Sequence, residues 1–136
     1  MAFVDEIAER LVGEGVGRVG STIIAGSGAV IPRGDGPFLT LIETGGTASA
    51  KTHNNTATQR PTLQLKARAS DQRQARALLK AAYNALGGEN GLHNVVLSDT
   101  FYLRIVARQE PTDTGQEEGT GRATFTFNIE VEKQPS

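Results

Sequence analysis

The most regular alternation of hydrophobic and polar residues lies between Arg60 and Leu86, where a strand pattern changes into a helix pattern. In residues 62–69 every second residue is leucine or alanine, which predicts a strand with one apolar and one polar face. Between Ala75 and Leu86, apolar residues recur every three or four positions, which predicts an amphipathic helix. The stripe consists of Ala75, Leu78, Leu79, Ala82, Tyr83 and Leu86.

Residues with capping preferences flank this predicted helix. The side chain of Ser70 or Asp71 can accept a hydrogen bond from a free N–H group of the first turn. Gly87 and Gly88 can adopt the left-handed conformation that ends a helix. The sequence therefore predicts a strand, a short corner and a helix in that order.

The remaining patterns predict one more helix and further strands. An apolar stripe that starts at Phe3 predicts a first helix ending at Gly13, with Asp5, Glu6 and Glu9 on its other face. The further expected strands are residues 21–25, 38–42, 95–97, 101–108 and 123–132.

Strand alternation sets the expected layers. In residues 101–108 it places Phe101, Leu103 and Ile105 on one face and Tyr102 and Arg104 on the other. Strands with a single apolar face are expected where helices cover one side of a sheet. We therefore predict an α+β fold of two layers, a mainly antiparallel sheet with two helices packed on one face.

Two polar stretches, residues 43–60 and 111–121, contain almost nothing that a core could use. Segments of this length inside a compact domain are usually functional or disordered when they lack secondary structure. We expect both to be flexible loops.

Composition excludes several classes of protein. A chain of 136 residues with 38% hydrophobic residues suits one domain over residues 1–136. No apolar run is long enough to cross a bilayer, and the acidic N-terminal segment is unlike a signal peptide, so we expect a cytosolic, unprocessed chain without a membrane partner. The absence of cysteine excludes thiolate chemistry, and the net charge of -1 gives no general attraction to nucleic acid.

Patterns that would indicate catalysis or ligand binding are weak. Glycines in residues 15–20 have the spacing of a dinucleotide-binding loop, but they follow a helix and favour a connector. His53 and His93 lie in separate polar segments without metal-ligand spacing. Ser98, His93 and Asp99 lack the sharp turn that exposes a nucleophilic serine. We expect no catalytic residue, cofactor or metal, and no enzymatic activity.

Charge is unevenly distributed along the chain, because the central segment is basic and the C-terminal part is acidic. One interpretation is two ordinary solvated faces with cross-strand ion pairs. The other is self-complementarity, in which the basic surface of one subunit meets the acidic surface of the next and the contacts close into a ring. Charge reversal at Arg68 or Arg73 is then expected to weaken the ring in a salt-sensitive way.

Several short signatures occur in an order that resembles the tail terminator family of long-tailed bacteriophages, often grouped with minor capsid or tail-completion proteins. They are the first helix with its glycine turn at residues 15–17, Glu43–Gly46, Arg60–Pro61 opening the alternating strand, Tyr83–Leu86 and Phe101–Ile105. The resemblance implies a structural virion protein, typically a homohexameric ring, that caps the tail tube, stops its polymerisation and presents a surface to the head-side connector.

The resemblance also implies the partners, which are copies of the chain, the tail tube protein and connector or neck proteins, with DNA only passing through the lumen. Assembly is expected in the cytoplasm of the bacterial host. The candidate residues for subunit, tube or connector contacts are Glu43, Arg60, Lys66, Arg68, Arg73, Arg76, Asp113, Glu117, Glu118 and Glu130.

Two alternatives remain open at this stage. A head-completion protein of the neck would share the size and polarity of the chain. A small nucleic-acid-binding α+β domain would use Lys66, Arg68, Arg73 and Arg76, and it would bind with a steep dependence on salt.

Overall fold

The computed structural model describes most of the chain, and this described part contains two α-helices, a short 3-10 helix and a seven-stranded sheet. The described residues are 3–17, 22–25, 37–51, 57–98, 100–116 and 123–134. The elements are α1 (Phe3–Gly13), β1 (Ile23–Ala25), β2 (Phe38–Lys51), β3 (Ala57–Ala69), α2 (Gln72–Ala85), η1 (Gly88–Asn90), β4 (Leu92–Leu97), β5 (Thr100–Ala107), β6 (Thr112–Gln116) and β7 (Ala123–Lys133).

The sheet is centred on β7. Its strand order is β1-β2-β3-β7-β5-β4, and β6 pairs with β7 outside this order. One edge of β7 pairs with β3 from Gln59 to Ala69, while the other edge is shared between β6 and β5. Only the short β1–β2 contact is parallel within the described sheet, so the prediction of a mainly antiparallel sheet is confirmed.

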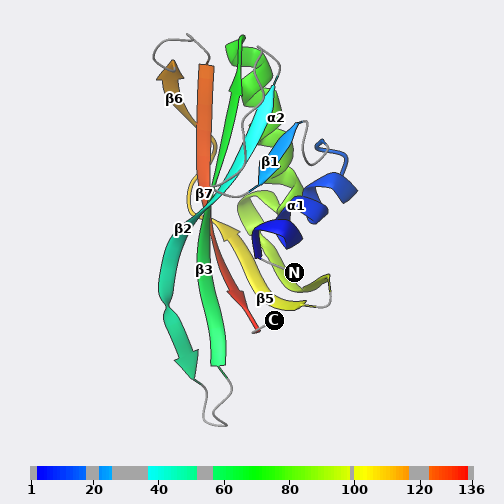
Figure 1. Cartoon of the computed structure of the whole chain (residues 1–136), viewed down its shortest axis with the longest axis vertical. Coiled ribbons are helices and arrows are strands. Elements are labelled where there is room, and N and C mark those ends of the chain that lie inside the picture. Colours follow the sequence, from blue (N-terminus) through cyan, green and yellow to red (C-terminus); the bar gives the residue numbers. More distant parts are fainter. Residues whose placement is uncertain are drawn as a thin grey trace.

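Both helices cover the same face of the sheet (Figure 1). The inward residues of β3 and β7 are buried in the same core as the apolar side of α2, and Leu65, Phe127 and Leu79 are fully buried there. Helix α1 contacts β1 and β2 and also β4, which lies at the other end of the strand order, so the sheet curls around the helices. The predicted two-layer α+β fold is confirmed.

The predicted ends of the central helix are also confirmed. Asp71 is the N-cap of α2, and its Oδ1 accepts a hydrogen bond from the backbone N–H of Arg73 at 3.1 Å. After the helix, Gly87 has a φ of 95°. Gly91 has a φ of 73°, and a Cβ there would lie 2.5 Å from the carbonyl oxygen of Ile105, so the close approach of β5 requires glycine.

The prediction of a loop over residues 43–60 is wrong wherever the structure describes that segment. Residues 43–51 continue β2 and residues 57–60 begin β3, while residues 52–56 lie outside the described residues. This part of the hairpin projects beyond the helices, so no core imposes an apolar pattern on it (Figure 1). Cross-strand pairing holds it instead, as in the 2.7 Å contact between the hydroxyl groups of Thr44 and Thr62.

The second predicted loop, residues 111–121, is also partly a strand. Residues 112–116 form β6 beside the first half of β7, and residues 117–121 lie outside the described part of the chain. The sequence of β6 shows no regular alternation of apolar and polar residues. The strand contains Gly115, and its pairing with β7 shifts register between Asp113 and Gly115.

Two burial predictions fail in the same corner of the molecule. A register shift between Tyr102 and Arg104 reverses the alternation of β5, so that Tyr102 and Ile105 are both fully buried, whereas Phe101 is only half-buried. Glu6, which was expected on the outer face of α1, is only 1% exposed.

Candidate functional site

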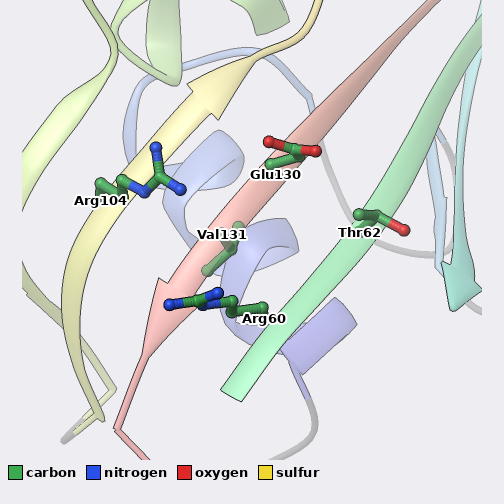
Figure 2. A pocket seen from close by; sticks show the side chains of 5 residues that line it. All are labelled: Arg60, Thr62, Arg104, Glu130 and Val131. Atoms are coloured by element: carbon green, nitrogen blue, oxygen red, sulfur yellow. The ribbon is translucent and has the colours of Figure 1, made fainter. Parts of the chain in front are cut away.

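Charged side chains line the sheet face that the helices leave uncovered, and we call this set the charged face. Its members are Arg60, Arg104, Arg108, Glu130 and Glu132. Arg60 on β3 and Arg104 on β5 converge on β7 from opposite sides (Figure 2). Glu132 lies between them, with its carboxylate oxygens 3.7 Å from Arg60 Nη2 and 3.4 Å from Arg104 Nε. Arg108 Nε lies 3.4 Å from Glu130.

Strand register explains the pair of Arg104 with Glu132, because these two residues are directly opposite each other in the β5–β7 ladder. The arginine side chains are about half exposed and only Glu132 is well shielded, at 20% exposure. Such pairs contribute roughly 0–1 kcal/mol each. Their main effect is that the two C-terminal acids are already matched by arginines of their own chain.

The charged face contains a shallow cavity of about 160 Å³. It is lined by Arg60, Thr62, Arg104, Glu130 and Val131. These residues include no nucleophile with a neighbouring base. Among all the residues that the structure describes, no three or more histidine, cysteine or acidic side chains are grouped to hold a metal ion.

A second surface is the groove between α2 and the β6–β7 pair, with a volume of about 360 Å³. The side chain of Gln72 donates a hydrogen bond to Asp113 at 2.8 Å, which joins α2 to β6. The Arg76 guanidinium lies 5.4 Å from the ring centre of Phe125, within the range of a cation–π contact. The groove is lined by Arg76, Lys80, Tyr83, Glu110, Pro111, Asp113 and Phe125.

Tyr83 forms one wall of this groove and packs edge-on against Phe127, with ring centres 5.5 Å apart. Burial raises the pKa of Tyr83 above its ordinary value, and the negative charges of Glu110 and Glu89 raise it further. The groove therefore has an apolar floor between cations on α2 and acids on β6 and on the segment that leads into it.

The predicted contact residues do not form a single site. Arg60 and Glu130 lie on the charged face, and Arg76 and Asp113 line the groove. The others are dispersed. Lys66 and Arg68 are half-buried on β3, Arg73 is exposed on α2 and Glu43 is exposed on β2, whereas Glu117 and Glu118 lie outside the described residues.

Sequence reasoning missed a third feature, a buried acid beneath the contact between α1 and β4. The hydroxyl group of Tyr102 donates a hydrogen bond to Oε1 of Glu6 at 2.7 Å. Burial, this hydrogen bond and the charge of Glu6 all raise the pKa of Tyr102. The only sequence signal was the position of Glu6 beside the apolar stripe, because a bulge in β5 turns Tyr102 inward.

Above this pair lies a pocket of about 190 Å³, which we call the α1–β4 pocket. The hydroxyl group of Ser98 donates a hydrogen bond to Glu9 at its rim. The pocket is lined by Glu6, Glu9, Arg10, Val96, Leu97 and Ser98. Acidic and apolar side chains thus meet on one exposed surface.

Comparison with solved structures finds the same fold in a chain of a virion particle. The chain is similar to a chain of the "Virion of native gene transfer agent (GTA) particle", with a TM-score of 0.68 and 14% sequence identity over 98% of this chain and 96% of that chain. At this identity the likeness concerns the fold alone. No curated protein matches the sequence.

A family model described as "Bacteriophage tail terminator protein" matches residues 10–135. The fold and this match define a structural protein of a phage-type tail. More particularly, the chain belongs to the bacteriophage tail terminator family, which confirms the resemblance seen in its sequence. No helix within the described residues has the length and apolar character needed to cross a membrane.

Proposed function

We propose that the chain forms a homo-oligomeric ring, a hexamer, that caps the tail tube, stops its polymerisation and joins it to the head-side connector. The observation that carries the proposal is the family match over residues 10–135. The partners are copies of the chain, the tube protein and connector or neck proteins. DNA passes through the lumen, assembly takes place in the host cytoplasm, and the role requires neither catalysis nor a cofactor.

The architecture supports such a role because it combines a stiff body with a projecting arm. Helix α1 bridges strands from both ends of the sheet and closes the curl, which favours a rigid subunit. The β2–β3 hairpin extends away from this body (Figure 1). A projecting hairpin can reach a neighbouring protein while the body remains in the ring, and we assign it to contact with the tube or the connector.

The charges of the described residues refine the proposal. Glu130 and Glu132 on the charged face already meet arginines of the same chain. Arg73 and Lys80 on α2 are exposed and form no ion pair within the described part of the chain. We therefore assign the basic side of the subunit contact to α2 rather than to the charged face.

Assembly of purified components tests the proposal. Light scattering at low salt is expected to give the mass of a closed oligomer, and negative-stain images are expected to show annular particles. Added to polymerising tube protein in substoichiometric amounts, the chain is expected to shorten the tubes. A monomer that leaves tube length unchanged would contradict the proposal.

Two further binding measurements, with connector protein and with DNA, distinguish the alternatives. Binding to connector without any effect on tube length would favour a head-completion protein. Affinity for DNA that falls steeply with salt would favour the nucleic-acid-binding domain.

A further inference from the structure

We infer that the α1–β4 pocket is the docking site for α2 of a second copy of this chain, with Arg73 and Lys80 supplying the positive charge. The inference rests on the proposed ring and assigns the two surfaces that meet in it. It concerns side chains that the family match leaves unassigned.

The first observation is a buried acidic group that is only half satisfied. Glu6 is 1% exposed, and Tyr102 provides a hydrogen bond to one of its oxygens. The other oxygen, Oε2, is buried and has no hydrogen-bond partner among the described residues, although Glu6 lines the pocket. A buried carboxyl oxygen without a hydrogen-bond partner is costly, so a cation placed at the pocket that Glu6 lines would offset part of that cost.

The second observation is that Arg10, the cation among the lining residues of the pocket, is held by other partners. Glu9 lies one helical turn beyond Glu6 and lines the same pocket. Arg10 is present too, but its Nε donates to the carbonyl oxygen of Ala85 at 3.1 Å and its Nη2 lies 3.2 Å from Glu14. Because Arg10 is engaged elsewhere, the acids of the pocket remain available to a basic partner.

The third observation is the apolar rim. Val96 lines the pocket and is 63% exposed, and Val12, which is 42% exposed, follows Glu9 by three positions on the same side of α1. They are the exposed large hydrophobic residues of the described chain. A partner that covers the pocket would remove the apolar surface of Val96 and Val12 from water, which favours its binding.

The complementary surface lies on the same chain. The outer face of α2, defined here as Arg73, Ala77, Lys80 and Ala81, is exposed along its whole length. Its two cations lie beside the small side chains of Ala77 and Ala81, and α2 contains no acidic residue. The alanines permit close approach of another surface, while Arg76 is already placed over Phe125.

These two surfaces are separate patches of one molecule. Ala85, near the C-terminal end of α2, contacts Arg10 of the pocket, whereas Arg73 lies twelve residues earlier, about 18 Å away along the helix axis. A patch that binds a different patch on an identical copy gives a head-to-tail contact, which closes into a ring when the rotation permits. A second copy is therefore the occupant that the charges favour.

Charge-swap variants test this pairing. Glu9→Lys and Lys80→Glu are each expected to remain folded by circular dichroism and to raise the apparent dissociation constant of the ring at least about tenfold. The double variant, which carries both Glu9→Lys and Lys80→Glu, is expected to recover the wild-type mass. Glu89→Lys, an equal charge change on the exposed η1 segment, is the matched control and is expected to leave the mass unchanged.

An equimolar mixture of the two single variants gives an independent readout. At each junction the lysine introduced into one variant then meets the glutamate introduced into the other, or an unchanged Glu9 meets an unchanged Lys80. An alternating ring with an even number of subunits is therefore expected to form. Single variants that keep the wild-type mass, or a double variant that does not recover it, would overturn the inference while the ring stands. A wild-type chain that forms no ring would instead overturn the proposed function.

Discussion

Glu6 takes part both in folding, through its hydrogen bond with Tyr102, and in the assembly inferred for the α1–β4 pocket, which it lines. The tyrosine hydroxyl holds one carboxyl oxygen of Glu6 inside the core, while the second oxygen is buried without a hydrogen-bond partner among the described residues. Phe3 lies beside the tyrosine ring, with ring centres 6.5 Å apart. The position of the acid therefore depends on side chains from both α1 and β5.

Removal of the Tyr102 hydroxyl is expected to destabilise the chain. Tyr102→Phe removes the donor to Oε1 of the buried Glu6, which costs on the order of 1–3 kcal/mol in the free energy of unfolding. Urea denaturation measures the loss. Tyr83→Phe is the matched control, because the Tyr83 side chain is only half-buried and its ring contact with Phe127 remains, and its effect should be clearly smaller. Equal losses in the two variants would contradict the assigned hydrogen bond.

Alkaline pH provides a second test at the same residue. The pKa of Tyr102 is raised in the folded chain, whereas in the unfolded chain it is about 10. Above this pH the unfolded chain releases a proton that the folded chain retains, so stability is complete below about pH 10 and falls as the pH rises further. Urea midpoints measured between about pH 8 and 11 are expected to fall more steeply for the wild type than for Tyr102→Phe. Parallel profiles would be inconsistent with the buried tyrosine.

At the scale of elements, local signals determined what the sequence could predict. The central strand and helix were predicted well, because alternation, helical period and the Asp71 cap all lie within neighbouring residues. The outer half of β2 was missed, because a strand that leaves the core no longer needs an apolar face. The inward turn of Tyr102 was missed because a bulge is a property of strand pairing.

The candidate site was predicted less well than the fold for the same reason. The basic and acidic segments were visible in the sequence, but ladder register decides that Arg104 lies opposite Glu132. The α1–β4 pocket joins residues about 90 positions apart in the chain, as in the contact of Ser98 with Glu9. No local pattern in the sequence records such a contact.

The connection between α2 and β4 is expected to be the most sensitive backbone element. Gly91→Ala would place a Cβ 2.5 Å from the carbonyl oxygen of Ile105 at a φ of 73°, so it must shift β5. We expect a loss of roughly 1–3 kcal/mol, measured by thermal denaturation. Gly13→Ala is the matched control, because its added Cβ meets nothing within 4 Å. A Gly91→Ala variant as stable as this control would contradict the close approach of β5.

At the scale of the whole molecule, different surfaces of the subunit have different roles. Both acids of the charged face are paired with arginines of the same chain, the β2–β3 hairpin projects beyond the body, and the helical side carries an acidic pocket and a basic helix face. Separate patches of opposite charge favour a directional contact between copies. The proposed ring and its contact with the tube therefore use different surfaces, which variants can separate.

Tail length in particles assembled without this chain tests the central claim most directly. Deletion of its gene is expected to give tails of abnormal and variable length, many longer than wild type and not joined to heads, when measured in negative-stain images. The wild-type gene supplied in trans is expected to restore one uniform length. Tails of normal length attached to heads in the deletion strain would contradict the account.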